Sequence, residues 1–164
     1  MADHGINVSR ADTAVATPNT ATCGIPFVIG TAPLSKATGT AATAGLPVLC
    51  TSYDEAKEQL GYDDDWAKYT VCEVMYYHFK LCACQPVIFL PLAENAEAEA
   101  VAAAVEQVEA CLTMFGIVPD LIMAPGFSKE ATVAAALAAK DTGGVFPSVS
   151  AVCYLDWLDP LLHH

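Results

Sequence analysis

The feature that most constrains the fold is an alternation of short apolar runs with segments of helical periodicity. Residues 25–29 form one apolar run, followed by glycine, and residues 121–124 form another, followed by proline and glycine. Runs bounded by such turn residues are typical of strands. Residues 86–90 are apolar at every position, which indicates a strand covered on both faces. Because strands and helices alternate, the sequence predicts an α/β domain with a mainly parallel sheet flanked by helices.

Four segments are predicted to be helices. Residues 96–115 are the clearest, because large apolar residues recur on one face and glutamates occupy the other. The helix over 66–81 is apolar on more than one side, so we expect it to be buried on both sides. The other predicted elements are a helix from a Thr51 or Ser52 cap to Gly61, a helix from a Ser128 cap to Lys140, and strands over 46–50 and 145–154.

Residues 1–22 differ in composition from the rest of the chain. They are rich in Ala, Thr, Asp, Asn and Ser, contain no aromatic residue and include few large aliphatic residues. A segment without a hydrophobic face of its own is not a self-sufficient core. We therefore expect an extended N-terminal arm over 1–22, for which a flexible tail is the plainer alternative, and an α/β core domain over 23–164.

The charge of the chain excludes several functions. Its 164 residues include 7 Lys and Arg against 19 Asp and Glu, for a net charge of −12. A nucleic-acid groove needs clustered basic residues, so no nucleic-acid partner is expected.

The chain is 54% hydrophobic, which disfavours disorder and requires apolar surface to be hidden in a core or against partners. The sequence shows neither a membrane-spanning stretch nor a secretory signal, so we expect a protein that is assembled in the cytoplasm without membrane anchoring.

Two turns near strand ends are the places where a ligand site could lie. Gly30-Thr31-Ala32-Pro33 and Ala124-Pro125-Gly126-Phe127 sit where α/β enzymes place their sites, but neither has the glycine pattern of a phosphate loop. No Gly-x-Ser-x-Gly elbow presents a serine, and a helix cap explains Ser128. We expect no enzyme activity. A small cytoplasmic α/β enzyme or ligand-binding module with its site at these strand ends remains the alternative.

The seven cysteines favour buried thiols in a reducing compartment, because their number is odd and most lie in apolar runs. Cys82-Ala83-Cys84 is the only close pair, and a zinc site would need two or more further ligands at a workable spacing. A thiol-based metal or redox protein is therefore a weaker alternative, and no cofactor is expected. The run Asp63-Asp64-Asp65 lacks the ligand spacing of a calcium loop and is expected to be a solvated helix start.

Several short motifs, taken in order, are similar to those of one family. They are His4, Gly5, Ile6, Asn7 and Val8; Gly30, Thr31, Ala32 and Pro33; Pro47-Val48; Thr51-Ser52; Glu55-Ala56; Gly61; and Ala124, Pro125, Gly126, Phe127 and Ser128. With these motifs the chain resembles the contractile tail sheath proteins of bacteriophages and related injection machines. The resemblance is scattered over residues 4 to 128, and the order and spacing of the motifs carry it.

This resemblance implies a structural protein. Sheath proteins have an α/β core of subtilisin-like topology that is not catalytic. Their arms pair with strands of neighbouring subunits, so the arm containing His4, Gly5, Ile6, Asn7 and Val8 would complete a neighbour's sheet by strand addition. The implied partners are other copies of this chain in a helical homo-oligomer and the tail tube protein. The implied location is the virion tail, after assembly in the bacterial host cytoplasm.

The chain also departs from the family pattern. Sheath proteins are usually much longer, so the resemblance implies that the C-terminal part of the core and the C-terminal arm are lacking here. Residues 82–91 lack the polar and basic residues expected at that place. If part of the core is lacking, apolar surface that faces it in longer proteins would be exposed, which fits the high apolar content.

Overall fold

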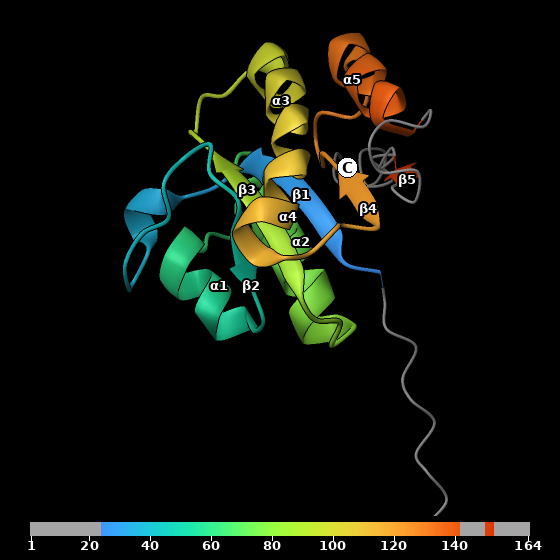
Figure 1. The fold of residues 1–164 in the computed structure, drawn as a ribbon. Coiled ribbons are helices and arrows are strands. Elements are labelled where there is room, and N and C mark those ends of the chain that lie inside the picture. Colours follow the sequence, from blue (N-terminus) through green and yellow to red (C-terminus); the bar gives the residue numbers. More distant parts are fainter. Residues whose placement is uncertain (1–23, 142–149, 153–164) are drawn as a thin grey trace, which may run out of the picture.

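A computed structural model describes residues 24–141 and 150–152 as a three-layer α/β arrangement with a central sheet (Figure 1). Within these residues the sheet has five strands, in the order β2-β3-β1-β4-β5. β1 pairs with both β3 and β4 in parallel, β4 pairs with β5 in parallel, and β2 pairs with β3 in the antiparallel sense. The predicted α/β class and mainly parallel sheet are confirmed. The strands are β1 (Pro26–Thr31), β2 (Val48–Cys50), β3 (Val87–Leu92), β4 (Leu121–Met123) and β5 (Ser150–Val152).

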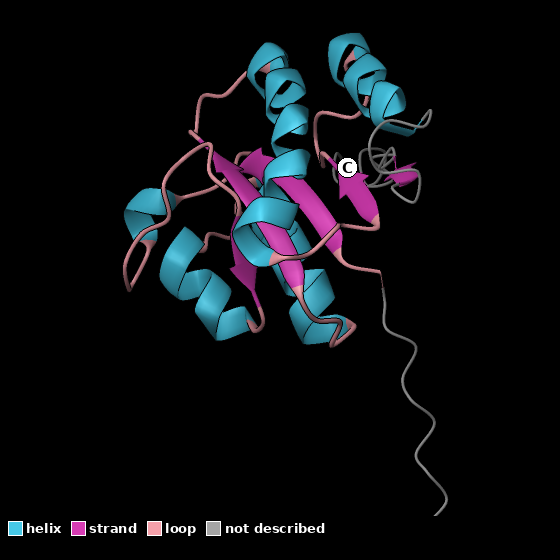
Figure 2. Ribbon diagram, in the orientation of Figure 1, coloured by secondary structure: helices cyan, strands magenta, loops and turns pink. Residues whose placement is uncertain are grey.

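Helices cover both faces of the sheet (Figure 2). One core cluster joins Phe27 and Ile88 to the helices after β3 and β4, and the other joins Val28 and Phe89 to the helices before β3. The side chains alternate between the two faces because successive strand residues point in opposite directions. The first face carries α3 (Ala98–Ala104), the 3₁₀ segment η3 (Val105–Glu109), α4 (Ala110–Phe115) and α5 (Ala131–Asp141); the second carries α1 (Tyr53–Leu60), α2 (Thr70–Met75) and the π-helical segment η2 (Tyr76–Leu81).

The central strands are buried as the sequence predicts. All six residues of β3 are buried, so the interpretation of residues 86–90 as a strand covered on both faces is confirmed. β1 is also buried throughout, and it extends through Gly30 and Thr31 rather than ending before them. The segment after β1 contains a short 3₁₀ turn, η1 (Leu34–Lys36).

The start and end of α1 follow the sequence closely. Ser52 is the N-cap, and its side chain accepts a hydrogen bond from the Glu55 backbone N–H at 3.2 Å. The Glu55 carboxylate in turn accepts hydrogen bonds of 2.7 Å from the Thr51 backbone N–H and from the Thr51 hydroxyl. Gly61 ends the helix with φ at 76°, a backbone angle that favours glycine. The predicted limits of this helix are confirmed.

The predicted helix over 66–81 is wrong in two respects. α2 begins at Thr70, because the preceding residues form a turn in which the Lys68 N–H donates to the Asp65 carboxylate at 3.3 Å. The expected burial on both sides also fails. Met75 and Phe79 are buried, whereas the Leu81 side chain is 58% exposed.

The helix predicted over 96–115 forms with its middle turn wound as a 3₁₀ helix. A 3₁₀ helix has three residues per turn instead of 3.6, so residues beyond η3 are rotated relative to an uninterrupted α-helix. Val105 and Val108 are buried as predicted, but Leu112 is 48% exposed. Gly116 ends the helix with φ at 67°, as the sequence indicates.

Several predictions lie wholly or partly outside the described residues. The arm over 1–22, including His4, Gly5, Ile6, Asn7 and Val8, is among them, as is most of the strand predicted over 145–154. Of that strand, Ser150–Val152 is described and forms β5 beside β4.

Candidate functional site

The fold brings the two turn motifs together at the carboxyl edge of the sheet. β1 and β4 are adjacent parallel strands, so Gly30 to Pro33 and Ala124 to Ser128 lie at neighbouring strand ends. In open α/β sheets this is the edge where ligands bind, at the point where successive connections pass to opposite sides of the sheet. The description of Gly30-Thr31 as part of a turn is corrected, because both residues belong to β1.

Thr70, the first residue of α2, fills the space between the two motifs. A Cβ added at Gly30 would lie 2.3 Å from the Thr70 hydroxyl oxygen, and a Cβ added at Gly126 would lie 2.7 Å from the Thr70 methyl carbon. Both positions therefore need glycine because of Thr70, which is only 5% exposed. Thr70 was not predicted from the sequence. The two glycines at neighbouring strand ends could have indicated that a side chain packs between them. They could not have indicated which residue supplies that side chain.

The hydroxyl groups of the motifs are used within the fold. The Thr31 hydroxyl donates to the Lys68 carbonyl at 2.6 Å and accepts from the Thr70 N–H at 3.2 Å, which fastens the start of α2 to the end of β1. The Ser128 hydroxyl donates to the Ala124 carbonyl at 3.2 Å. α5 begins three residues beyond Ser128, at Ala131, so the prediction of Ser128 as its cap is wrong.

One buried polar atom at this edge has no hydrogen-bond partner. It is the Thr70 hydroxyl oxygen, which lies against the backbone of β1 at Gly30. A buried hydroxyl without a partner destabilises the folded state by roughly 1–3 kcal/mol. Thr70 therefore destabilises the folded state through its unpaired hydroxyl, and an apolar side chain at this position would avoid that cost.

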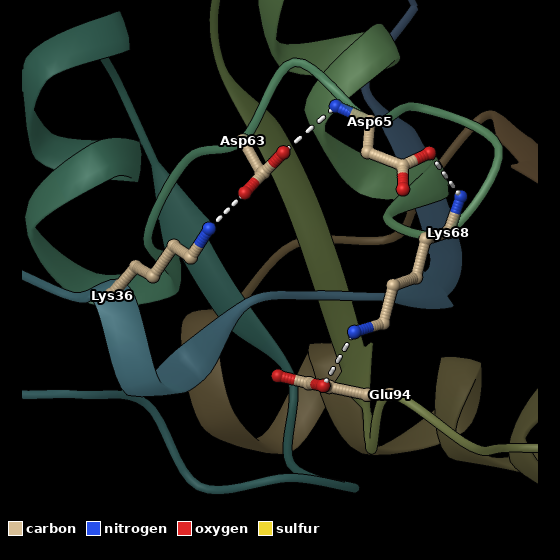
Figure 3. Close-up of polar contacts among 5 residues, drawn as sticks. All are labelled: Lys36, Asp63, Asp65, Lys68 and Glu94. Atoms are coloured by element: carbon tan, nitrogen blue, oxygen red, sulfur yellow. Dashed lines mark hydrogen bonds and ion pairs between the residues drawn. The ribbon is translucent and has the colours of Figure 1, made fainter.

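A chain of charged side chains covers the same edge (Figure 3). Lys36 in η1 pairs with Asp63, whose other oxygen accepts the Asp65 N–H at 2.8 Å. Lys68 pairs with Glu94 after β3, at 3.0 Å between the charged atoms. These contacts connect three loops that are distant in sequence. The sequence does not predict these ion pairs, because the spacing between the partners has no periodic pattern.

Tyr69 lies beneath these charges and is 5% exposed. The Lys68 ammonium nitrogen is 4.8 Å from the centre of its ring and that of Lys36 is 5.8 Å away. Hydrogen bonds from Lys68, and then from Tyr69, lower the pKa of Glu94, and the bond from Lys36 lowers the pKa of Asp63. Both carboxylates are therefore held in the charged form. A permanently charged carboxylate is suited to an ion pair that connects two loops and is less suited to proton transfer.

The run Asp63-Asp64-Asp65 is not a helix start, since α2 begins at Thr70. Asp63 and Asp65 instead organise the turn before that helix. Among the described residues, no group of three or more His, Cys, Asp or Glu side chains is placed to bind a metal ion.

The cysteine prediction is confirmed in part. Cys50, Cys72 and Cys111 are buried, and burial raises the pKa of the Cys50 thiol to about 12. Cys82 is exposed and Cys84 is half-buried, so the expectation of buried thiols is wrong for this pair. Cys23 and Cys153 lie outside the described residues.

A scan against protein-family models matches no family, and a search of curated proteins finds no match. In the part of the chain that the structure describes, no helix is both long and apolar enough to cross a membrane.

Proposed function

We propose that this chain is a structural subunit of a contractile phage tail sheath or a related injection machine. Copies of it would polymerise around the tail tube protein and contract to drive the tube through the host envelope. The finer expectation of a subtilisin-like core topology is part of this proposal. So is a final location in the virion tail, after assembly in the host cytoplasm.

The observation that carries the proposal is the filled carboxyl edge. An α/β enzyme leaves this edge open for its ligand, whereas here Thr70 occupies the space between Gly30 and Gly126. The hydroxyl groups of Thr31 and Ser128 are engaged by backbone groups. The motifs that carry the family resemblance thus act as packing elements, which supports a subunit without catalytic activity.

The linkage between subunits is assigned to the N-terminal arm. Among the strands that the structure describes, β2 lies at one edge of the sheet and β5 at the other. An extended segment can add to a sheet edge through main-chain hydrogen bonds. We propose that His4, Gly5, Ile6, Asn7 and Val8 of one copy add to a sheet edge of a neighbour. This places the arm in the helical lattice rather than in the core of its own subunit.

Electron microscopy of the purified protein tests the proposal. Rings, tubes or sheath-like polymers are expected, and deletion of residues 1–20 is expected to abolish them while the far-UV circular dichroism of the core is retained. A protein that remains a monodisperse monomer at every salt concentration would contradict assembly. Unfolding of the core on deletion would contradict the arm model alone.

One observation favours the alternative of a ligand-binding module. The Thr70 hydroxyl is buried at the carboxyl edge without a partner, as a group awaiting a ligand would be. Thr70→Val keeps the shape and removes the hydroxyl. Native mass spectrometry that shows a small molecule bound to the wild-type protein and lost from this variant would favour the alternative. A variant that is equally or more stable, with no such molecule, supports the structural role.

A further inference from the structure

The turn between η2 and β3 holds a pair of cysteines that the proposed function does not use. Cys82 and Cys84 are both in the thiol form, and Ala83 lies between them. The turn leads into the first residue of β3, so it lies at the amino edge of the sheet. The pair therefore belongs to a different part of the molecule from the filled carboxyl edge.

Access to solvent separates these two thiols from the other cysteines that the structure describes. Cys82 is exposed and Cys84 is half-buried, whereas Cys50, Cys72 and Cys111 are buried. Burial raises the pKa of the Cys50 thiol to about 12 and the pKa values of the Cys72 and Cys111 thiols to about 11. The thiolate is the reactive form of cysteine, so burial protects these three residues from reagents in solution. Within the described residues, Cys82 and Cys84 are the thiols that an external reagent can reach.

The backbone of the turn holds the two cysteines close together. The Cys82 N–H donates to the Tyr77 carbonyl at 2.9 Å, and the Cys84 N–H donates to the His78 carbonyl at 2.8 Å. Ala83 has φ at 50°, in the left-handed region that residues other than glycine rarely adopt. Two residues span at most about 7 Å when the chain is extended, and the bend at Cys82 brings the ends closer. This spacing fits the Cα separation of about 4.4–6.8 Å that a disulfide requires.

The two side chains of the pair are placed differently. The Cys84 Sγ donates to the Cys82 carbonyl oxygen at 3.6 Å, so this sulfur lies against the backbone of the other cysteine. The Cys82 side chain is the more accessible of the two to solvent. An accessible thiol with a second thiol beside it is the arrangement of an attacking cysteine and a resolving cysteine.

We propose that Cys82 and Cys84 close reversibly to a disulfide by exchange with a small-molecule disulfide such as that of glutathione. Cys82 is the attacking residue and Cys84 is the resolving residue. A reducing compartment keeps the pair open, and oxidising surroundings close it. The proposal is independent of whether copies of this chain assemble.

The exchange has two steps. The Cys82 thiolate attacks one sulfur of glutathione disulfide, whose S–S bond breaks; one glutathione thiolate leaves and a mixed disulfide forms at Cys82. The Cys84 thiolate then attacks the Cys82 Sγ and releases the second glutathione thiolate. Two electrons pass from the pair to glutathione disulfide, and the two protons lost by the cysteine thiols convert the released thiolates to thiols.

Treatment of the folded full chain with glutathione disulfide tests the proposal. After an acid quench and alkylation in urea, trypsin and Glu-C protease release a peptide over 81–94, whose only cysteines are Cys82 and Cys84. A second peptide, over 110–129, contains Cys111 alone and serves as the internal control. Mass spectrometry is expected to find the 81–94 peptide unalkylated and two hydrogen atoms lighter than its dithiol form, and the 110–129 peptide alkylated.

Two single variants separate the roles of the cysteines. Cys84→Ser is expected to stop at the mixed disulfide, with glutathione retained on Cys82. Cys82→Ser is expected to react with glutathione disulfide at least about tenfold more slowly, because the remaining thiol is half-buried. Circular dichroism checks that both variants are folded.

Several results would overturn the proposal. A wild-type 81–94 peptide that keeps both thiols, or that carries glutathione without closing, contradicts the disulfide. A bond between two copies on a non-reducing gel, lost in either variant, contradicts closure within one chain. Equal rates for the two variants contradict the assignment of Cys82 as the attacking residue.

Discussion

Gly61 and Gly116 each end a helix with a positive φ, yet their surroundings differ completely. A Cβ at Gly61 would lie 2.2 Å from the Pro33 carbonyl oxygen and 3.1 Å from the Ala37 nitrogen. A Cβ at Gly116 would meet no atom within 4 Å. Gly61 lies at the carboxyl edge of the sheet, where the loops are packed on one another. Gly116 lies at the amino edge, where the chain turns back into β4.

The same contrast extends over both edges. At the carboxyl edge, Thr70 occupies the space between two glycines and ion pairs connect three loops. Of the four large apolar side chains that are exposed among the described residues, three lie towards the amino edge, where Leu81 is 58% exposed, Leu112 48% and Met114 49%. The fourth, Leu46, is 49% exposed and lies near Pro91 at the carboxyl end of β3. In an α/β enzyme the carboxyl edge is the open one. Here Thr70 and the ion pairs close part of that edge.

The largest expected effect comes from substituting the two glycines. Gly61 has φ at 76° and ψ at 174°, a region that is essentially restricted to glycine, so Gly61→Ala combines backbone strain with a clash against immobile backbone. We expect a loss of about 3 kcal/mol or more. Gly116→Ala should cost only about 1–2 kcal/mol, the penalty of the left-handed conformation alone. Urea unfolding of both variants measures the difference, and equal losses would refute the contrast between the edges.

A second test concerns the contact between Gly30 and Thr70. Gly30→Ala is expected to cost about 2 kcal/mol, because the new Cβ overlaps the Thr70 hydroxyl. Thr70→Ala removes the obstacle, so the double variant should be more stable than the sum of the single effects predicts. Gly39→Ala is the control, since its nearest contact is the Glu58 Cβ at 3.3 Å and the site is exposed. Additive effects in the double-mutant cycle would contradict the packing role of Thr70.

The sequence predicted the fold class because local patterns specify it. The apolar runs at β1, β3 and β4, the Ser52 cap and the glycines that end helices all act within a few residues. The structure differs from the prediction where the local sequence pattern fits more than one backbone conformation. The start of α2 depends on Asp63 and Asp65 forming a turn, and the 3₁₀ segment η3 has no distinct composition.

The candidate site was predictable only in part. The motifs at Gly30 and Gly126 could be placed at strand ends because each follows an apolar run. Their adjacency depends on the strand order, which the sequence does not specify without pairing information. The ion pairs Lys36–Asp63 and Lys68–Glu94 join residues that are 27 and 26 positions apart in the sequence. Contacts at such a separation follow from tertiary structure alone.

The smallest expected effect tests the rotation that η3 imposes towards the amino edge. In a continuous α-helix Leu112 would share the buried face with Val108, and Leu→Ala at a buried site costs about 2–5 kcal/mol. Because Leu112 is 48% exposed, Leu112→Ala should cost less than about 1 kcal/mol. Val108 is 1% exposed, so Val108→Ala should cost more even though it removes fewer carbon atoms. Urea unfolding compares the two variants; a greater loss for Leu112→Ala would show that this side chain is buried and that the helix runs without the 3₁₀ turn.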